Sequence, residues 1–350
     1  MNELSNRVVQ DLFKRYYAGV DSFGIKRIKN RELAFTTFGR QGMVRHTSFQ
    51  SMQALVDYVK NNTPAHFYYS SAYYDNPDAS MDSKKWIGAD LIFDIDGDHI
   101  EGAEKMGYSE MLTAVKEELK KLLLLLTDDI SVDKQNIEIV FSGSRGYHVH
   151  VYSIFEGLES QERREIVDYV SGRCISLDSK HTANSKWTEK INKVKESLIQ
   201  ILDSQDKKWR QRIEEETGDS TGALSKKELR KSDYVERNAR KLAVKKFSSK
   251  IDEPVTIDIH RLIRTPGSLH GKSGLMVKEL QIDKIENFDP LRDAIPPVFQ
   301  ENFEVSVGKK ILLEFEGERR ELNEGKYTLP AYAALFVVLK GSAEFLDLPK

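Results

Sequence analysis

The aspartates at positions 94 and 96 form the pattern in this chain that is best suited to chemistry. They end an apolar run, and alternate residues of a strand point to the same face. Leu91, Phe93 and Ile95 are therefore expected in a core, with Asp94 and Asp96 together on the other face. Neighbouring carboxylates repel each other unless a cation such as Mg²⁺ or Mn²⁺ neutralises them. The pair predicts the core of a phosphoryl-transfer site with two ions roughly 3.5–4 Å apart, and two solvated acids at a strand end are the alternative.

A second polar cluster lies in the loop from Ser142 to His148. Its glycines let the backbone approach a ligand, while the hydroxyls of Ser142 and Ser144 and the guanidinium of Arg145 suit phosphate. His148 and His150 alternate with valines, so both rings are expected to face the site, where His148 would donate to a triphosphate oxygen. The loop is not a Walker loop, and a glycine-rich hairpin with a surface arginine is the alternative.

The third cluster combines an acid, two arginines and a histidine. Asp252 precedes a predicted strand over 255–259, and Arg261 and Arg264 are spaced to share one face of a predicted helical turn. His270 follows in a glycine-containing loop. An acid for metal and cations for a triphosphate are what nucleotidyl transfer requires.

Two further polar residues accompany this cluster. Asp258 is a competing acid, but its place directly before the predicted turn suits a helix N-cap, so we assign it a structural role. Lys272 lies in His-Gly-Lys-Ser-Gly and is assigned a supporting contact to phosphate or nucleic acid.

The elements expected to position these clusters follow from apolar periodicity and from breaker residues. The tail from 304 to 350 offers two β-like runs and an apolar stretch at 331–339, which is as consistent with core as with an interface. Helices are predicted at 3–18, 52–59 (capped by Ser48 or Ser51) and 111–126, and strands at 32–35, 43–46, 67–70, 91–96, 137–142 and 149–152.

The stretch 156–250 differs from the rest, because it is rich in Lys, Arg and Glu and has almost no strand signal. It contains one clear helical pattern, from Trp187 to Ile201. We therefore predict an α+β fold in which residues 1–155 and 251–350 form a catalytic core, with a mixed β-sheet flanked by helices, and 156–250 form a helical insertion. Residues 226–250 carry ten Lys or Arg against three acids, which fits either a solvated helix face or contact with nucleic-acid phosphates.

Composition restricts the class of protein further. The 350 residues carry a formal net charge of −2 and a single cysteine, Cys174, which excludes an internal disulfide and a cysteine-based zinc cluster. That cysteine usage suits a reducing cytoplasm. No apolar run approaches the roughly 20 residues that cross a bilayer, and the N-terminus has no signal-peptide pattern. We expect a cytoplasmic protein without a membrane partner.

The three clusters, in this order, resemble the catalytic small subunit of the archaeal and eukaryotic replicative DNA primase, and archaeal members most closely. The resemblance spans most of residues 30–275. It is carried by 31–35 (Arg-Glu-Leu-Ala-Phe), 45–49 (Arg-His-Thr-Ser-Phe), 94–99 (Asp-Ile-Asp-Gly-Asp-His), 142–148 and 252–274.

The resemblance implies a role for each matching residue. Asp94, Asp96 and Asp252 would hold two Mg²⁺ or Mn²⁺ ions, so that Asp252 supplies the third acid. The incoming nucleotide's triphosphate would be bound by Ser142, Arg145, His148, Arg264 and His270, with Arg45, Ser144 and Arg261 as further candidates.

The resemblance also implies an activity and partners. The activity is synthesis of short RNA primers on a single-stranded DNA template from NTPs, with dNTPs as a further substrate. The implied partners are a primase large subunit, in a heterodimer, and other replication proteins. Many archaeal members carry a Cys/His zinc knob after the paired aspartates, whereas residues 100–108 contain no cysteine, so we predict no zinc of that type.

Two other functions are compatible with parts of the pattern. A self-sufficient primase-polymerase acting in repair or on a plasmid would use the same chemistry without a large subunit. A non-enzymatic module that binds single strands would stack bases on exposed aromatic rings and would not depend on metal. Its candidate aromatics are Phe67, Tyr68, Tyr69, Tyr73 and Tyr74.

Overall fold

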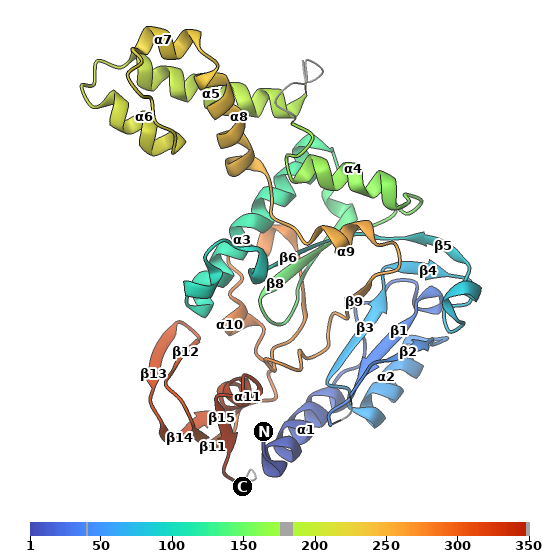
Figure 1. The fold of residues 1–350 in the computed structure, drawn as a ribbon. Helices are drawn as coiled ribbons and strands as arrows, with labels where there is room; N and C mark the ends of the chain where they lie inside the picture. The colour runs from blue at the N-terminus through green and yellow to red at the C-terminus, as the bar shows by residue number, and fades with distance from the viewer. Residues whose placement is uncertain (40, 176–184, 348–350) are drawn as a thin grey trace. The chain divides into compact units, whose positions relative to one another are not determined.

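The computed structural model describes residues 1–39, 41–175 and 185–347, and its chain contacts divide into two compact units. The first unit comprises Met1–Glu117, Asp133–Arg163 and Ile251–Lys350. The second comprises Glu118–Val132 and Arg164–Lys250. The mixture of helices with antiparallel sheets agrees with the predicted α+β class (Figure 1).

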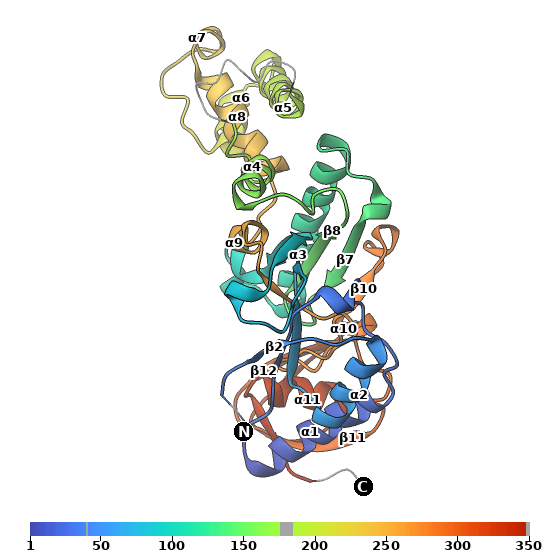
Figure 2. The same ribbon diagram turned by 90° about the vertical axis from the view of Figure 1, so that its right-hand side faces the viewer.

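The sheet that carries the paired aspartates has the order β10-β7-β8-β6, of which β10, β7 and β8 are labelled in Figure 2. Strand β6 pairs antiparallel with β8, so that Asp94 lies opposite His148 and Asp96 opposite Gly146. The apolar residues that alternate with the two acids in β6 are buried, which confirms the predicted division of faces. The strands are β6 (Leu91–Asp96), β7 (Ile137–Phe141), β8 (Gly146–Val151) and β10 (Lys278–Leu280).

A second sheet of the first unit has the order β2-β1-β3-β9. In it Tyr68 lies opposite Arg264, which joins the N-terminal segment to the third cluster. Ser51 caps the helix that follows β2, as one of the two predicted caps. The elements are α1 (Glu3–Ala18), β1 (Leu33–Thr36), β2 (Val44–Thr47), α2 (Met52–Asn62), β3 (His66–Ser70) and β9 (Leu262–Arg264); a separate pair is β4 (Ala72–Tyr74) with β5 (Trp86–Ala89).

The prediction for residues 255–264 is wrong in both parts. Instead of a strand, the structure has a short helix, α9 (Glu253–Ile257), and instead of a helical turn it has β9. Pro254 stands at the start of α9, where its fixed φ favours a helix, and this outweighs the β-branched residues that follow. Asp258 is not a helix N-cap, because a strand and not a helix follows it; it is instead the C-cap residue of α9, and its carboxylate accepts a hydrogen bond from the backbone N–H of His260 at 2.8 Å.

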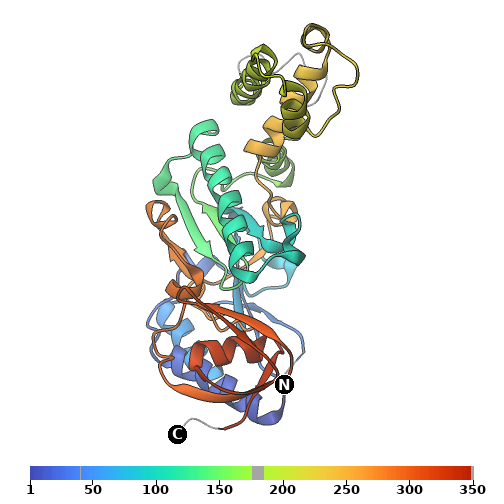
Figure 3. The same cartoon turned by 90° about the vertical axis from the view of Figure 1, so that its left-hand side faces the viewer.

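The C-terminal segment contains more strands than the two β-like runs predicted. One sheet has the order β14-β11-β15, and β12 pairs with β13 as a hairpin. The apolar stretch at 331–339 is a helix, α11, whose side chains are mostly buried, so it is core (Figure 3). The elements are α10 (Pro290–Asp293), β11 (Asn302–Val307), β12 (Ile311–Phe315), β13 (Glu318–Leu322), β14 (Gly325–Pro330), α11 (Ala331–Leu339) and β15 (Ala343–Phe345).

Helices form the described part of the second unit. Its longest helix, α5, buries Trp187, Ile191 and Leu198 at helical spacing, in agreement with the prediction for this segment. The helices are the end of α3 (Tyr108–Leu124) with the π-turn Leu125–Asp129, most of α4 (Ser160–Val170), α5 (Lys186–Asp203), α6 (Trp209–Thr217), α7 (Lys226–Lys231) and α8 (Tyr234–Phe247). No described helix of the chain is long and apolar enough to cross a membrane.

The basic stretch at 226–250 pairs many of its charges inside the second unit. Ion pairs join Glu236 to Lys195, Lys241 to Asp219, and Arg237 to Asp233. These contacts engage only part of the charge of the stretch, so both the solvated-face interpretation and phosphate contact stay predictions. The domain boundaries proposed from the sequence, with an insertion at 156–250, remain a prediction.

Candidate active site

The paired acids lie at the end of β6, on the face opposite the core. Asp94 is partly buried, with 20% of its side chain exposed, and Asp96 is 30% exposed. Asp252 enters from the start of α9, where its backbone N–H donates to the carbonyl of Asp94 at 2.8 Å. The structure therefore brings the backbone of Asp252 beside the pair.

The electrostatics of Asp94 indicate a place for a cation. Burial, reinforced by the charges of Asp96 and Asp252, raises the pKa of the Asp94 carboxyl to about 7. The described residues contain no group of three His, Cys, Asp or Glu side chains arranged to hold a metal ion. The two β6 carboxylates nevertheless fit Mg²⁺, which is usually bound by one or two carboxylates together with water and substrate phosphates.

The loop between β7 and β8 has the geometry of a tight turn. Gly143 has φ +80°, and a Cβ there would lie 2.8 Å from the Cβ of His270, so only glycine fits. The Ser142 hydroxyl accepts a hydrogen bond from the N–H of Gly146 at 3.2 Å. The carbonyl of Ser144 accepts one from the Tyr108 hydroxyl at 2.6 Å. These contacts fix the loop that carries Arg145.

Arg145 is occupied by an acid that the sequence analysis did not consider as a partner. Its guanidinium donates to Asp98 at 2.7 Å and lies 3.3 Å from a carboxylate oxygen of Asp96. Although partial burial opposes its charge, the hydrogen bond to Asp98 and the two carboxylates raise the pKa of Arg145. A triphosphate would have to compete with Asp98 for this arginine.

The two histidines of β8 have different environments. His148 lines the pocket beside Asp94, with Nε2 3.8 Å from the carboxylate, while its buried Nδ1 has no hydrogen-bond partner among the described residues. Burial, assisted by His150 and by Arg264 and Arg261, holds its pKa well below the usual range, so the ring is neutral and this contact is no ion pair.

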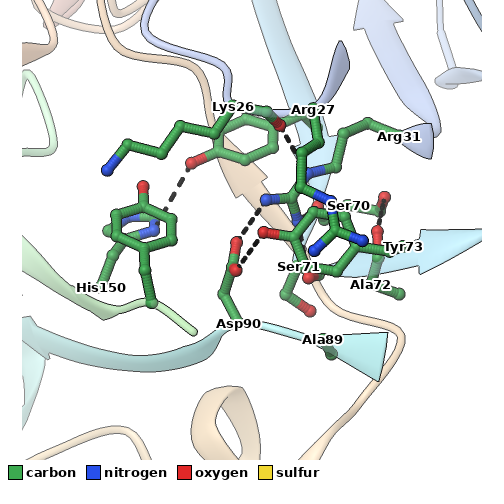
Figure 4. Close-up of polar contacts among 12 residues, drawn as sticks. Lys26, Arg27, Arg31, Ser70, Ser71, Ala72, Tyr73, Ala89, Asp90 and His150 are labelled. Carbon is green, nitrogen blue, oxygen red and sulfur yellow. Dashed lines mark hydrogen bonds and ion pairs between the residues drawn. The ribbon is translucent and has the colours of Figure 1, made fainter. Parts of the chain in front are cut away.

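His150 does not face the pocket, contrary to the prediction. It is fully buried, and the Tyr69 hydroxyl lies 3.4 Å from its Nδ1. Figure 4 shows it beside a polar cluster in which Arg31 and Tyr73 both donate to Asp90 at 2.5 Å. This cluster ties the residue before β6 to the segment before β1.

The arginines of the third cluster enter the pocket from β9 and the turn before it. Arg264 contacts His66 Nδ1 at 2.5 Å and donates to the Tyr68 hydroxyl at 3.3 Å. Burial lowers the pKa of Arg264, and it lowers the pKa of His66 to about 3, with the charge of Arg264 adding to the effect. Arg264 reaches the pocket from β9 and Arg261 from the turn before it, so no shared helical face brings them together.

The loop after β9 completes the wall. His270 is buried, and its Nδ1 accepts a hydrogen bond from the backbone N–H of Lys272 at 3.2 Å. Burial and the nearby Arg264 hold the pKa of His270 well below its usual range. Lys272 also lines the pocket.

Together these residues line one cavity of about 650 Å³, a size in the range of small-molecule sites. It contains the acids Asp94 and Asp96 and, from the predicted set, Ser142, Ser144, Arg145, His148, Arg261, Arg264 and His270. Its other polar lining residues, which the sequence analysis did not assign to the site, are His66, Tyr68 and Lys340. His66 and Tyr68 alternate with buried Phe67, so strand periodicity could have found them.

Two predicted residues do not line this cavity. Asp252 lies beside it as described. Arg45 belongs to β2, where its guanidinium donates to the buried carboxylate of Glu32 at 3.0 and 3.3 Å. A direct contact between Arg45 and the nucleotide is therefore not supported by this arrangement.

The aromatic residues that a base-stacking module would need are mostly buried. Phe67, Tyr69, Tyr73 and Tyr74 are at most 1% exposed, and only Tyr68 of this set lines the cavity. The alternative of a single-strand binding module loses its main support.

Paired carboxylates that face several cations are the arrangement that metal-assisted transfer from a polyphosphate requires. Comparison with known proteins agrees. Residues 93–282 match the family of the DNA primase small subunit. The chain is 39% identical to the DNA primase small subunit PriS of Thermoplasma volcanium, over 98% of both chains. It is 39% identical to PriS of Methanococcoides burtonii, over 95% of this chain and 96% of that one.

The chain therefore belongs to the DNA primase small subunit family. Primases are nucleotidyltransferases, and the chain is an enzyme of that class. Among solved structures, the polymerase domain of Mycobacterium tuberculosis Ligase D in complex with DNA aligns with a TM-score of 0.38 and 13% identity, covering 83% of this chain and 88% of that chain.

Proposed function

We propose that this chain makes short RNA primers on single-stranded DNA, as the small subunit of a primase with a larger partner. The observation that carries the proposal is the shared cavity, in which the β6 acids face the loop cations and the arginines of the third cluster. Family membership supports the activity, and the cavity supports the assignment of residues. The proposal includes dependence on Mg²⁺ or Mn²⁺.

In this mechanism Asp94 and Asp96 would hold divalent ions, and Asp252 would contribute through its place beside Asp94. Bound metal would lower the pKa of the attacking 3′-hydroxyl and neutralise charge on the departing pyrophosphate. The hydroxyl oxygen bonds to the α-phosphorus of the incoming nucleotide, and the bond to the bridging oxygen of the β-phosphate breaks. The electron pair of that bond leaves with pyrophosphate. The proton of the hydroxyl is released to water.

The cations of the pocket position the triphosphate. Arg145 offers a planar fork to the phosphate oxygens once it leaves Asp98, and Arg264 is held ready by His66 and Tyr68. His148 and His270 are neutral, so each can donate one ring N–H without adding charge. Holding the α-phosphorus in line with the hydroxyl supplies most of the rate enhancement.

The test is primer synthesis by the purified chain on unprimed single-stranded DNA with labelled NTPs or dNTPs, with Mg²⁺, Mn²⁺ or EDTA. We expect metal-dependent products that disappear in the Asp94→Ala and Asp96→Ala variants, whose melting temperatures should stay close to wild type. Near-normal synthesis by Asp94→Ala would refute the metal assignment. A chain inactive alone but active with a purified large subunit would support the heterodimer, while strong unaided DNA synthesis would favour a primase-polymerase.

A further inference from the structure

The C-terminal helix α11 forms part of the wall of the active-site cavity. Its last residue, Leu339, and the residue that follows, Lys340, both line the cavity. The helix also packs directly on the loop that carries His270, because a Cβ at Gly274 would lie 2.5 Å from Leu335. The position of Lys340 is therefore tied to the position of that loop.

Aromatic rings hold the side chain of Lys340 near the β7–β8 loop. Its Nζ lies 5.3 Å from the ring centroids of both Tyr108 and Phe336, within the range of a cation–π contact. Tyr108 in turn donates its hydroxyl to the carbonyl of Ser144 at 2.6 Å. A chain of contacts thus links the lysine to the loop that carries Arg145.

Lys340 adds to a concentration of like charges. Burial of its ammonium group, with Arg145 and Lys272 nearby, lowers its pKa, and only Asp96 acts in the opposite direction. Among the described residues its Nζ forms no ion pair or hydrogen bond. Asp98 and Asp96 compensate Arg145, whereas Lys340 has no such partner among the described residues, so an anion with several charged oxygens would offset its repulsion from the other two cations.

We propose that Lys340 binds the triphosphate of the incoming nucleotide, through the oxygens of its β- and γ-phosphates, together with Arg145 and Lys272. This inference rests on the proposed function, and it adds a residue from the C-terminal segment to the site. A lysine suits the task, because its ammonium is a point charge on a flexible stem that can follow the departing pyrophosphate. Arg145, by contrast, has to break its ion pair with Asp98 before it can bind phosphate.

A DNA backbone is the other polyanion that this lysine could contact. The triphosphate is favoured because Lys340 shares its cavity with the paired acids and with Arg145 and Lys272. A template strand carries one charge per phosphate, whereas a triphosphate concentrates its charge over the three cations. The experiment has to separate these two ligands.

The test uses calorimetric titration of inorganic tripolyphosphate into the full-length chain, in EDTA and again with Mg²⁺. The variants are Lys340→Met and Lys340→Arg. The matched control is Lys326→Met, which removes an exposed lysine of β14 from the same C-terminal segment. Melting temperatures and binding of a short single-stranded oligonucleotide are measured on the same samples.

We expect Lys340→Met to weaken tripolyphosphate binding about tenfold, a loss of about 1.4 kcal/mol. Lys340→Arg should retain most of the affinity, and Lys326→Met all of it. In nucleotide incorporation, KM for NTP should rise with a smaller change in kcat. The proposal is overturned if Lys340→Met binds tripolyphosphate like wild type, if wild type does not bind it, or if only the oligonucleotide is affected.

The outcome does not depend on primer synthesis, because binding is measured directly and without metal. Failure of the proposed function would appear instead as a wild-type chain that incorporates no nucleotide with any metal or with a large subunit. Should Lys340→Met melt well below wild type, the titration is repeated at a temperature at which both chains are fully folded, and the same tenfold loss is expected there.

Discussion

The contact between Arg145 and Asp98 occupies the residue best suited to bind phosphate. Asp98 is 65% exposed and Arg145 38% exposed, so their attraction is screened by solvent. Exposed pairs of this kind are worth about 0–1 kcal/mol. The contact is thus strong enough to compete with a nucleotide and weak enough to be broken by one.

Replacing Asp98 by Asn should tighten nucleotide binding. The change keeps the shape of the side chain and removes its charge. Less free energy is then needed to free Arg145 for binding the triphosphate. We expect KM for NTP to fall by up to about fivefold, which corresponds to about 1 kcal/mol, with kcat and the melting temperature little changed. The measurement is steady-state primer extension.

Asp82→Asn serves as the control, because it removes another exposed acid that lies outside the pocket. Its KM should equal that of wild type. An Asp98→Asn variant whose KM is unchanged or higher would mean that the ion pair does not compete with the triphosphate.

Most of the pocket residues could be predicted because local spacing displays them. The alternation around Asp94 and the sequence from Ser142 to His148 each place polar groups on one side of a short element. Lys340 carries no such signal, because it is a single lysine after an apolar helix. Its role depends on where the C-terminal sheet places that helix, and no local pattern contains this information.

Among the elements, the segment from 253 to 264 shows how local preference can mislead. Its β-branched residues favour a strand, but Pro254 starts a helix and the following Leu262–Arg264 pairs with β3. Backbone pairing with a strand almost two hundred residues away decides the outcome, and it is absent from any short window. The prediction that both arginines belong to the site does not depend on this error, because both line the cavity.

The turn between β7 and β8 should tolerate no side chain at Gly143. In a Gly143→Ala variant the positive φ of this position becomes strained. The added Cβ also lies only 2.8 Å from His270 and 3.2 Å from Val277. The backbone term alone costs about 1 kcal/mol, and crowding adds about 1–3 kcal/mol. We expect a lower melting temperature and a higher KM for NTP, because His270 is displaced.

Gly317→Ala provides the comparison, since this glycine has φ +81° in the β12–β13 turn but no atom within 4 Å of the added Cβ. It should lower the melting temperature by only about 2–4 °C and leave KM unchanged. Equal effects of the two substitutions would show that the contact with His270 is unimportant.

For the molecule as a whole, buried histidines make the stability of the first unit depend on pH. Burial lowers the pKa of His150 from 6.5 to about 3, with the charges of Arg31 and Lys26 adding to the effect. The pKa values of His66, His148 and His270 are lowered as well, again mainly by burial. Each ring is therefore neutral in the folded chain under conditions in which it is protonated in the unfolded chain.

The direction of this pH dependence follows from which state of the chain, folded or unfolded, binds the proton. Between about pH 3 and pH 6.5 the unfolded chain protonates His150 and the folded chain does not, so stability falls as the pH is lowered. At about pH 4.5 this one histidine has lowered the free energy of unfolding by about 2.7 kcal/mol. Asp94 acts in the opposite direction, because its pKa is raised on folding.

A comparison of variants isolates the contribution of His150 from these other groups. His150→Asn should flatten the dependence of the unfolding free energy on pH between about pH 6 and pH 4.5, by about 1.4 kcal/mol per pH unit, which is one proton. Urea unfolding at several pH values measures this slope, whatever the variant's stability at neutral pH. His99→Asn, which changes an exposed ring, should keep the wild-type slope. If the slopes of His150→Asn and wild type coincide, then His150 takes up a proton in the folded chain, and its neutral place beside Tyr69 is wrong.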